Sequence, residues 1–111
     1  MSLKLEQADS LREDFALQLL WYAREAGAKT ARRFYEAVDS TLLRLCERPE
    51  LGRERHFKHP RLQGIRSFRV AGSFHCVLIF YRVKGDALQA VRLMHGARDL
   101  RRLAEPSGSS V

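Results

Sequence analysis

The segment HCVLIFYRV (residues 75–83) constrains the fold most, because it is apolar on both faces of any strand that it forms. Successive side chains of a strand point to opposite faces. One face would carry Val77, Ile79, Tyr81 and Val83, and the other Cys76, Leu78 and Phe80, followed by Arg82. An antiparallel sheet in a small domain normally leaves one face polar and hydrated. The second apolar face therefore predicts either a partner protein or cover by another part of this chain, for which residues 50–63 are the candidate.

Two amphipathic helices are available to cover the first face of that strand. In residues 10–26 the apolar side chains recur every three or four positions, which predicts a helix with one apolar face. Asp9 or Ser10 is the candidate N-cap, and Glu13, three residues after Ser10, is placed to complete a capping box. Gly27 ends this helix, and the same periodicity predicts a second one over residues 28–47, which Pro49 ends. A short glycine turn between two such helices predicts an antiparallel helical hairpin.

Three further segments are predicted to form strands. Residues 3–6 alternate apolar and polar side chains, and residues 65–70 and 87–95 flank the central strand across short turns that contain glycine. We therefore predict a two-layer α+β fold of order β-α-α-β-β-β, in which a short strand and a helical hairpin pack on an antiparallel sheet. A short C-terminal helix is predicted from ARDLRRL (residues 97–103), so that residues 1–104 form one domain and residues 105–111 a disordered tail.

The charge of the chain is unevenly distributed. Residues 1–50 hold eight Lys and Arg against nine Asp and Glu, a net charge of −1, and the rest hold twelve against four, a net charge of +8. This asymmetry favours an acidic protein or a nucleic acid as the partner of the C-terminal half. No apolar run reaches the roughly 18 residues of a membrane span, and the N-terminal residues do not resemble a secretion signal. We therefore expect a cytoplasmic protein that does not enter membranes.

Neither the cysteines nor the histidines predict a metal site. Cys46 and Cys76 are far apart in sequence, so we expect both to be reduced and packed. His56 and His59 are three residues apart, but no second ligand pair completes a site. We expect no metal and no cofactor.

The segment RLMHGARDLRRL (residues 92–103) follows the last apolar strand and concentrates positive charge. Its arginines predict a docking surface for an acidic or anionic target: Arg92, Arg98, Arg101 and Arg102. His95 has two interpretations. It is either a functional group or a strand-terminal histidine that shares a face with Val91 and Leu93.

Four short motifs carry a resemblance to a known family. They are Pro49-x-x-Gly52, GIRSF (residues 64–68), IFYRV (residues 79–83) and HGARD (residues 95–99). Together with the order of the predicted elements, they make residues 3 to 103 similar to the ParE/RelE superfamily of bacterial type II toxin–antitoxin modules. The resemblance is to its ParE, or plasmid-stabilisation, branch.

The resemblance implies a partner and a target. Toxins of this superfamily are neutralised by a cognate antitoxin that wraps its C-terminal segment around them, which predicts a hetero-oligomer and agrees with the basic half and the apolar second face. We expect the antitoxin to bind the second face, at Cys76, Leu78, Phe80 and Arg82. ParE-like members resemble inhibitors of DNA gyrase and have no established catalytic residues, so the arginines of residues 92–102 would contact the target.

Two alternatives remain open at this point. A RelE-like toxin would cut messenger RNA on the ribosome, with His95 as the base and a phosphate clamp drawn from Arg66, Arg82, Arg92 and Arg98. Cleaving members commonly carry an aromatic side chain near the C-terminus, and this chain has none after Tyr81. The other alternative is a non-toxic nucleic-acid-binding module that stacks bases on Phe68, Phe74 and Tyr81, although alternation places most of these rings in the core.

Overall fold

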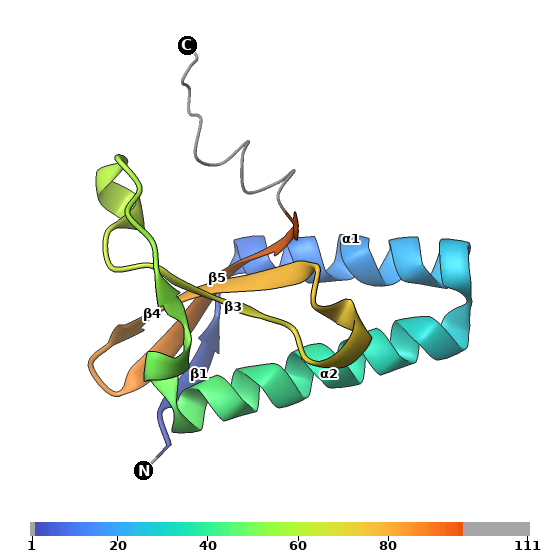
Figure 1. The fold of residues 1–111 in the computed structure, drawn as a ribbon, viewed down its shortest axis with the longest axis horizontal. Coiled ribbons are helices and arrows are strands. Elements are labelled where there is room, and N and C mark those ends of the chain that lie inside the picture. The colour runs from blue at the N-terminus through green and yellow to red at the C-terminus, as the bar shows by residue number, and fades with distance from the viewer. Residues whose placement is uncertain (1, 97–111) are drawn as a thin grey trace.

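The computed structural model describes residues 2–96, which form two helices against a five-stranded sheet (Figure 1). The helices are α1 (Asp9–Ala26) and α2 (Ala28–Glu47). The strands are β1 (Lys4–Gln7), β2 (Arg53–Glu54), β3 (Arg66–Arg69), β4 (Val77–Lys84) and β5 (Ala87–His95). The predicted two-layer α+β layout is confirmed. The predicted helix at residues 97–103 and the tail at 105–111 lie outside the described residues.

The sheet is mixed, with strand order β1-β5-β4-β3-β2. Neighbouring strands are antiparallel except for β1, which runs parallel to β5 and pairs Lys4 with Ala87 and Gln7 with Ala90. A parallel pair needs a long crossover connection, and everything between β1 and β5 supplies it here. The prediction of an antiparallel sheet therefore holds for β2 to β5, and β1 is the exception.

The connection between α2 and β3, which includes the candidate cover at residues 50–63, contains secondary structure that its sequence did not predict. It contains the short 3₁₀ helices η1 (Pro49–Leu51) and η2 (Pro60–Leu62), and β2, which pairs Arg53 with Ser67 on β3. A two-residue strand gives no periodicity, so only its tertiary partner reveals it. A third 3₁₀ helix, η3 (Gly72–Phe74), lengthens the turn between β3 and β4.

The start of α1 differs from the predicted capping box. The N-cap is Ala8 and makes no side-chain cap bond. The hydroxyl of Ser10 instead donates a hydrogen bond to the carbonyl of Val91 on β5, at 2.6 Å. Ser10 therefore joins α1 to the sheet instead of capping the helix.

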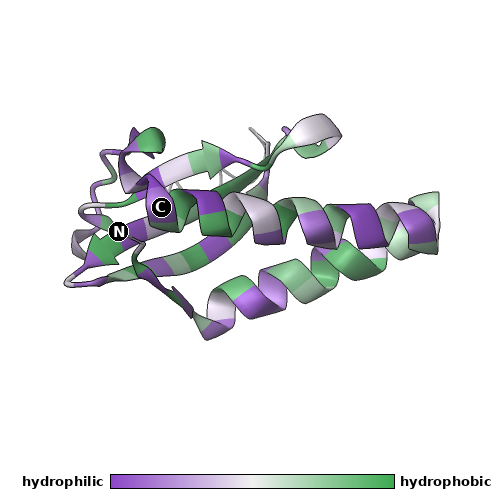
Figure 2. Ribbon diagram, turned by 90° about the horizontal axis from the view of Figure 1, so that it is seen from below, coloured by the Kyte–Doolittle hydropathy of each residue, from purple (hydrophilic) through white to green (hydrophobic). Residues whose placement is uncertain are grey.

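The main core lies between the helices and one side of the sheet, which we call the helix face. The helices lie side by side and antiparallel, and hydrophobic segments alternate with hydrophilic ones along them (Figure 2). Phe34 of α2 is fully buried and contacts the rings of Phe15, Tyr22 and Phe74. The strands contribute buried side chains to the same cluster: Val77, Ile79, Tyr81, Leu88, Ala90 and Leu93.

A bulge interrupts the pairing of β4 with β5. Phe80 pairs with Arg92 but Tyr81 pairs with Ala90, which leaves Val91 as the extra residue of β5. Leu93 accordingly packs in the helix-face core, while Val91 packs against the cluster on the other side of the sheet. The predicted shared face therefore holds for Leu93 and His95 and is wrong for Val91, because the bulge shifts the alternation by one residue.

Candidate functional site

The side of the sheet opposite the helices, which we call the outer face, has an apolar centre. Phe80, Ile65 and Met94 are buried there, and partly buried side chains pack around them: Phe57, Leu62, Leu78 and Val91. Phe57 and Leu62 come from the connection between β2 and β3, and the ring of Phe57 lies 6.3 Å from that of Phe80. The connection thus covers part of the second apolar face, and Phe80 is 1% exposed.

The four residues predicted to bind an antitoxin differ in access. Leu78 and Arg82 are half-buried on β4, and Cys76 is exposed just before the strand. Cys46 is buried, so the expectation that both thiols are packed holds only for Cys46. Cys76 lies outside the strand and meets solvent. A ligand on the outer face would therefore contact Leu78 and Arg82 directly, with Phe80 beneath them.

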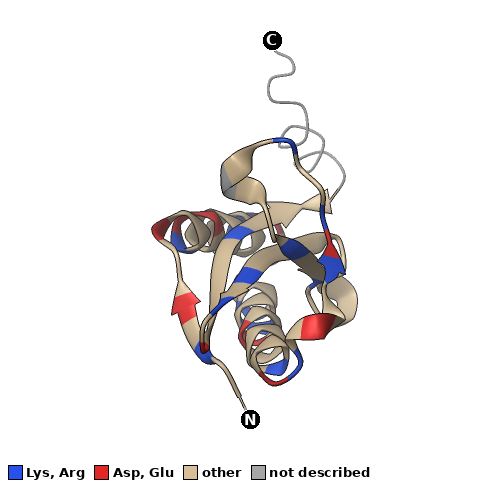
Figure 3. Ribbon diagram, turned by 90° about the vertical axis from the view of Figure 1, so that its left-hand side faces the viewer, with Lys and Arg blue, Asp and Glu red and all other residues tan. Residues whose placement is uncertain are grey.

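Arginines surround this apolar centre. Residues that pair directly across antiparallel strands share a face, so Arg69 lies beside Leu78 and Arg92 beside Phe80. Arg82 is two residues beyond Phe80 on β4, and Arg55 reaches the same face by donating from Nε to the hydroxyl of Ser67 at 2.7 Å. Figure 3 shows the resulting Lys and Arg positions on neighbouring strands. We call Arg55, Arg69, Arg82 and Arg92 the arginine rim.

Arg55 is a partly buried member of the rim without a carboxylate partner among residues 2–96. Partial burial, and then the nearby charge of Arg53, lower the pKa of its guanidinium. A partly desolvated cation of this kind favours an anionic partner, which would restore the lost solvation.

Arg82 has polar partners in the sheet. Its Nε donates to the side-chain oxygen of Gln89 at 3.0 Å, and the amide of Gln89 donates to Glu6 at 3.0 Å. The three side chains link β4, β5 and β1 across the outer face, beside a hollow of about 270 Å³ that they line with Val91. Glu6 makes this end of the face less basic than the end that carries Arg55.

Arg92 belongs to an ion pair with α1. Its Nε donates to a carboxylate oxygen of Asp14 at 2.7 Å, and the same oxygen accepts the backbone N–H of Leu93 at 2.9 Å. β1 pairs only with residues 87–90 of β5, so beyond Ala90 the side chains of α1 provide hydrogen-bond partners for the backbone at this edge of β5. Arg92, predicted to contact a target, therefore also fixes the end of β5 against α1.

The Pro49-x-x-Gly52 motif meets the IFYRV strand on the helix face. The hydroxyl of Tyr81 accepts the N–H of Gly52 at 2.8 Å and donates to the carbonyl of Pro49 at 2.6 Å. Burial is the main cause that raises the pKa of Tyr81. Arg66 donates to the carbonyl of Gly52 at 2.7 Å and forms an ion pair with Glu54. The motif is thus a structural joint between η1, β3 and β4.

The candidate nuclease residues are not brought together within the described chain. Arg66 pairs with Tyr81 and lies on the helix face, while Arg82 lies on the outer face. His95 pairs with Val77, five residues from Arg82 along β4, a separation of about 16 Å at the usual rise of a strand. Arg98, Arg101 and Arg102 lie outside the described residues.

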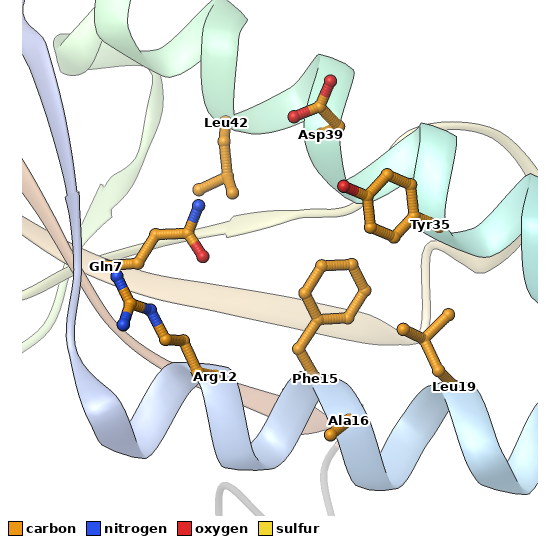
Figure 4. Close-up of a pocket in the computed structure, with 8 residues that line it drawn as sticks. All are labelled: Gln7, Arg12, Phe15, Ala16, Leu19, Tyr35, Asp39 and Leu42. Carbon is orange, nitrogen blue, oxygen red and sulfur yellow. The ribbon is translucent and has the colours of Figure 1, made fainter.

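Two further hollows flank the helices. One, of about 290 Å³, lies between α1 and α2, where Phe15 stacks on Tyr35, and Gln7 and Arg12 lie together at the end next to β1 (Figure 4). The other, of about 420 Å³, is lined by His95 and by side chains of α1: Leu17, Gln18 and Trp21. Neither was predicted, because no local pattern shows which helix surface the end of a strand will meet.

Sequence reasoning also missed Asp14 and Arg55. In the sequence, Asp14 is one of several charged residues in the first turns of α1, and Arg55 is one of several basic residues between α2 and β3. Their roles depend on partners far along the chain, Leu93 and Ser67. No pattern in the sequence indicates that Asp14 binds Leu93 or that Arg55 binds Ser67.

Within residues 2–96, no helix has the length and apolar character needed to cross a membrane. A comparison with curated protein sequences gave no match. Comparison with solved structures shows the fold in several bacterial toxins, all of low sequence identity.

The chromosomal ParDE system of P. aeruginosa matches with a TM-score of 0.69 at 18% identity, covering 86% of this chain and 97% of that one. A YoeB/ParE toxin from Agrobacterium tumefaciens matches with a TM-score of 0.55 at 18% identity, covering 84% and 98%. An arginine-substituted variant of the E. coli toxin RelE in the free state matches with a TM-score of 0.53 at 12% identity, covering all of both chains.

The family profile described as the ParE toxin of the type II toxin–antitoxin system parDE matches residues 5–100. That span includes both helices, all the strands from Leu5 onward and the Pro49-x-x-Gly52 joint to Tyr81. The chain belongs to the ParE toxin family of type II toxin–antitoxin systems.

Proposed function

We propose that this ParE-family toxin inhibits DNA gyrase and is neutralised by an antitoxin whose acidic and apolar side chains bind the outer face. The observation that carries the antitoxin site is the apolar centre around Phe80 and Leu78, bordered by the arginine rim. A segment with apolar side chains for the centre and carboxylates for the rim would complement both.

Three features support this location. Arg55 lacks a carboxylate partner among residues 2–96, whereas Arg92 already pairs with Asp14. An acidic side chain of the antitoxin would therefore contribute more binding free energy beside Arg55 than beside Arg92. Leu78 and Cys76 offer accessible surface next to the buried Phe80. The net charge of +8 on residues 51–111 steers an acidic partner toward this half of the chain.

Gyrase inhibition rests on the family and on the distribution of the candidate catalytic groups. ParE-like toxins resemble gyrase inhibitors, and Arg66, Arg82 and His95 do not converge on one point as a nuclease would require. We place target contact in the arginines after β5, which are Arg98, Arg101 and Arg102, with Arg92 holding the end of the strand against α1.

The antitoxin site is tested by Arg55→Gln and Arg82→Gln. Each should slow association with the antitoxin by about tenfold at low salt and flatten the salt dependence of the rate, because rim charges steer the encounter. Arg32→Gln on α2 is the matched control, since Arg32 is an exposed arginine that pairs with Glu36 of its own helix. Equal effects of Arg32→Gln and Arg55→Gln would show that net charge matters and that the outer face does not.

The target is tested with purified toxin in two assays. We expect loss of supercoiling by gyrase and no cleavage of ribosome-bound messenger RNA, and antitoxin should reverse the gyrase effect. Cleavage of messenger RNA with unimpaired gyrase would establish the RelE-like activity instead.

A further inference from the structure

Helix α1 and strand β5 run alongside each other in register. Ser10 bonds the carbonyl of Val91 at 2.6 Å, Asp14 bonds the N–H of Leu93 at 2.9 Å, and His95 lines a hollow with the next turn of α1. Four residues of helix rise about 6 Å and two residues of strand about 6.6 Å, so the two elements stay matched turn by turn. The last contact of this ladder is at the end of β5.

Helix α1 continues beyond the end of β5 and leaves an apolar surface there. α1 extends to Ala26, eight residues past Gln18. Leu17 is 67% exposed, Leu20 49% and Trp21 53%, which is unusual for large apolar side chains gathered on one helix surface. The hollow of about 420 Å³ lined by Leu17, Gln18, Trp21 and His95 lies at this surface, and we call it the α1 groove.

The chain itself leads directly into the α1 groove. His95 forms one wall, and Gly96, with φ of +45°, turns the backbone immediately afterwards. Fifteen residues follow, and in residues 97–104 the apolar side chains recur every third position, at Ala97, Leu100 and Leu103. That spacing is one stripe of a helix, with the arginines at 98, 101 and 102 on its other sides.

We propose that residues 97–104 bind the α1 groove, with Leu100 and Leu103 against Leu17 and Trp21. Leu100 is four residues from Gly96, and four residues span about 6 Å as helix or about 13 Å as strand, so the exposed turn of α1 is within reach. Because the segment is tethered at the groove, its effective concentration is in about the millimolar range, which favours it over a free ligand. Docking in this way directs Arg98, Arg101 and Arg102 away from α1 and into solvent.

Trp21 is the only tryptophan of the chain and lines the groove, so its fluorescence reports the occupant directly. We compare the full chain with the double variant Leu100→Ser and Leu103→Ser and with a chain that ends at Gly96. Both changes should shift the Trp21 emission to longer wavelength and raise its quenching by acrylamide. Far-UV circular dichroism and thermal melting verify that each variant retains the fold.

Two matched controls make the result specific. A chain that ends at Ala104 keeps the proposed segment, and Arg101→Gln with Arg102→Gln keeps its apolar stripe. Both should retain the emission of the full chain. The proposal is overturned if the serine variant leaves the emission unchanged, or if the glutamine variant shifts it equally.

Other occupants of the groove give different outcomes. An emission that shifts with protein concentration, together with a dimer by light scattering in every variant, would identify a second copy of this chain. An emission that moves only when antitoxin is added, equally in the full chain and in the chain that ends at Gly96, would identify the antitoxin. Either outcome would overturn docking of residues 97–104.

Discussion

The hydroxyl of Tyr81 lies 2.8 Å from the backbone nitrogen of Gly52, and the ring packs directly over the position where any other residue would carry a Cβ. A Cβ at Gly52 would overlap the hydroxyl and ring of Tyr81, although the backbone conformation there is one that any residue adopts. The glycine is therefore required for close approach and not for an unusual turn. This contact shows in physical terms how Pro49-x-x-Gly52 and the tyrosine of β4 depend on each other in this chain.

Gly52→Ala should destabilise the fold by about 1–3 kcal/mol, because the added methyl group displaces Tyr81 from a closely packed core. Tyr81→Phe should cost about 1–3 kcal/mol for a different reason, since it leaves the N–H of Gly52 buried without its acceptor. Urea unfolding measures both. Tyr35→Phe, at a tyrosine that is 52% exposed, is the control and should leave the midpoint unchanged. A neutral Gly52→Ala would contradict the contact.

Alkaline pH should weaken the fold through the same tyrosine. Burial raises the pKa of Tyr81 above its ordinary value of 10.0, so above that pH the unfolded chain loses a proton that the folded chain keeps. The free energy of unfolding contributed by Tyr81 is complete below pH 10 and declines as the pH rises through the raised pKa. Unfolding measured between pH 9 and pH 11 should therefore show a smaller decline in Tyr81→Phe than in the unmodified chain.

Neighbouring residues of β4 should separate folding from partner binding. Ile79 is fully buried on the helix face, so Ile79→Ala should cost about 2–5 kcal/mol of stability and leave antitoxin affinity unchanged in the remaining folded protein. Phe80→Ala removes the centre of the outer face, so it should cost a similar amount and also weaken antitoxin binding.

Val83→Ala, at a side chain of the same strand that is 45% exposed, is the control for both. Calorimetric melting and titration with antitoxin provide the two readouts. If Ile79→Ala weakened antitoxin binding as much as Phe80→Ala, the assignment of the outer face would be wrong.

The basic segment after β5 should carry inhibition through its charge. Replacing Arg98, Arg101 and Arg102 together by alanine should abolish growth inhibition while leaving the melting temperature unchanged, because exposed charges contribute little to stability. Inhibition of the target should also weaken with rising salt. His95→Gln should leave toxicity almost intact.

A nuclease would behave in the opposite way. His95→Gln would then lose the roughly 10²–10⁴-fold that a positioned base contributes, with antitoxin binding and melting temperature unchanged. Growth assays with inducible expression, run beside the purified variants, decide between the two.

The two helices and the longer strands of this fold could be predicted because their signals are local, whereas the two-residue strand β2 could not. The bounds of α2 and the alternating faces of β4 follow from the periodic placement of residues such as Phe34, Val38 and Ile79, which are all fully buried. The second apolar face could be predicted for the same reason. Cover by residues 50–63 and cover by a partner protein are both compatible with the structure. Phe57 and Leu62 pack on Phe80, while Leu78 stays partly accessible to a partner.

The relations that the sequence could not reveal depend on distant partners. Ser10 looks like a helix cap, yet its hydroxyl bonds Val91, 81 residues away. The bulge at Val91 leaves no mark in a run of residues that alternates well on either side of it, so Val91 was wrongly assigned to the face of Leu93 and His95. The arginine rim likewise forms only when β2, β3, β4 and β5 are side by side.

The pairing of β1 with β5 has a consequence for synthesis on the ribosome. Lys4 pairs with Ala87, which is synthesised 83 residues later, so β1 lacks its partner strand throughout that interval. At about 5–20 residues per second, the nascent helical hairpin lacks the complete sheet for several seconds, and its apolar surface stays exposed during that time. The outer face is built from β3, β4 and β5, so it is complete only after β5 has been synthesised, and a partner of that face meets no finished surface before then.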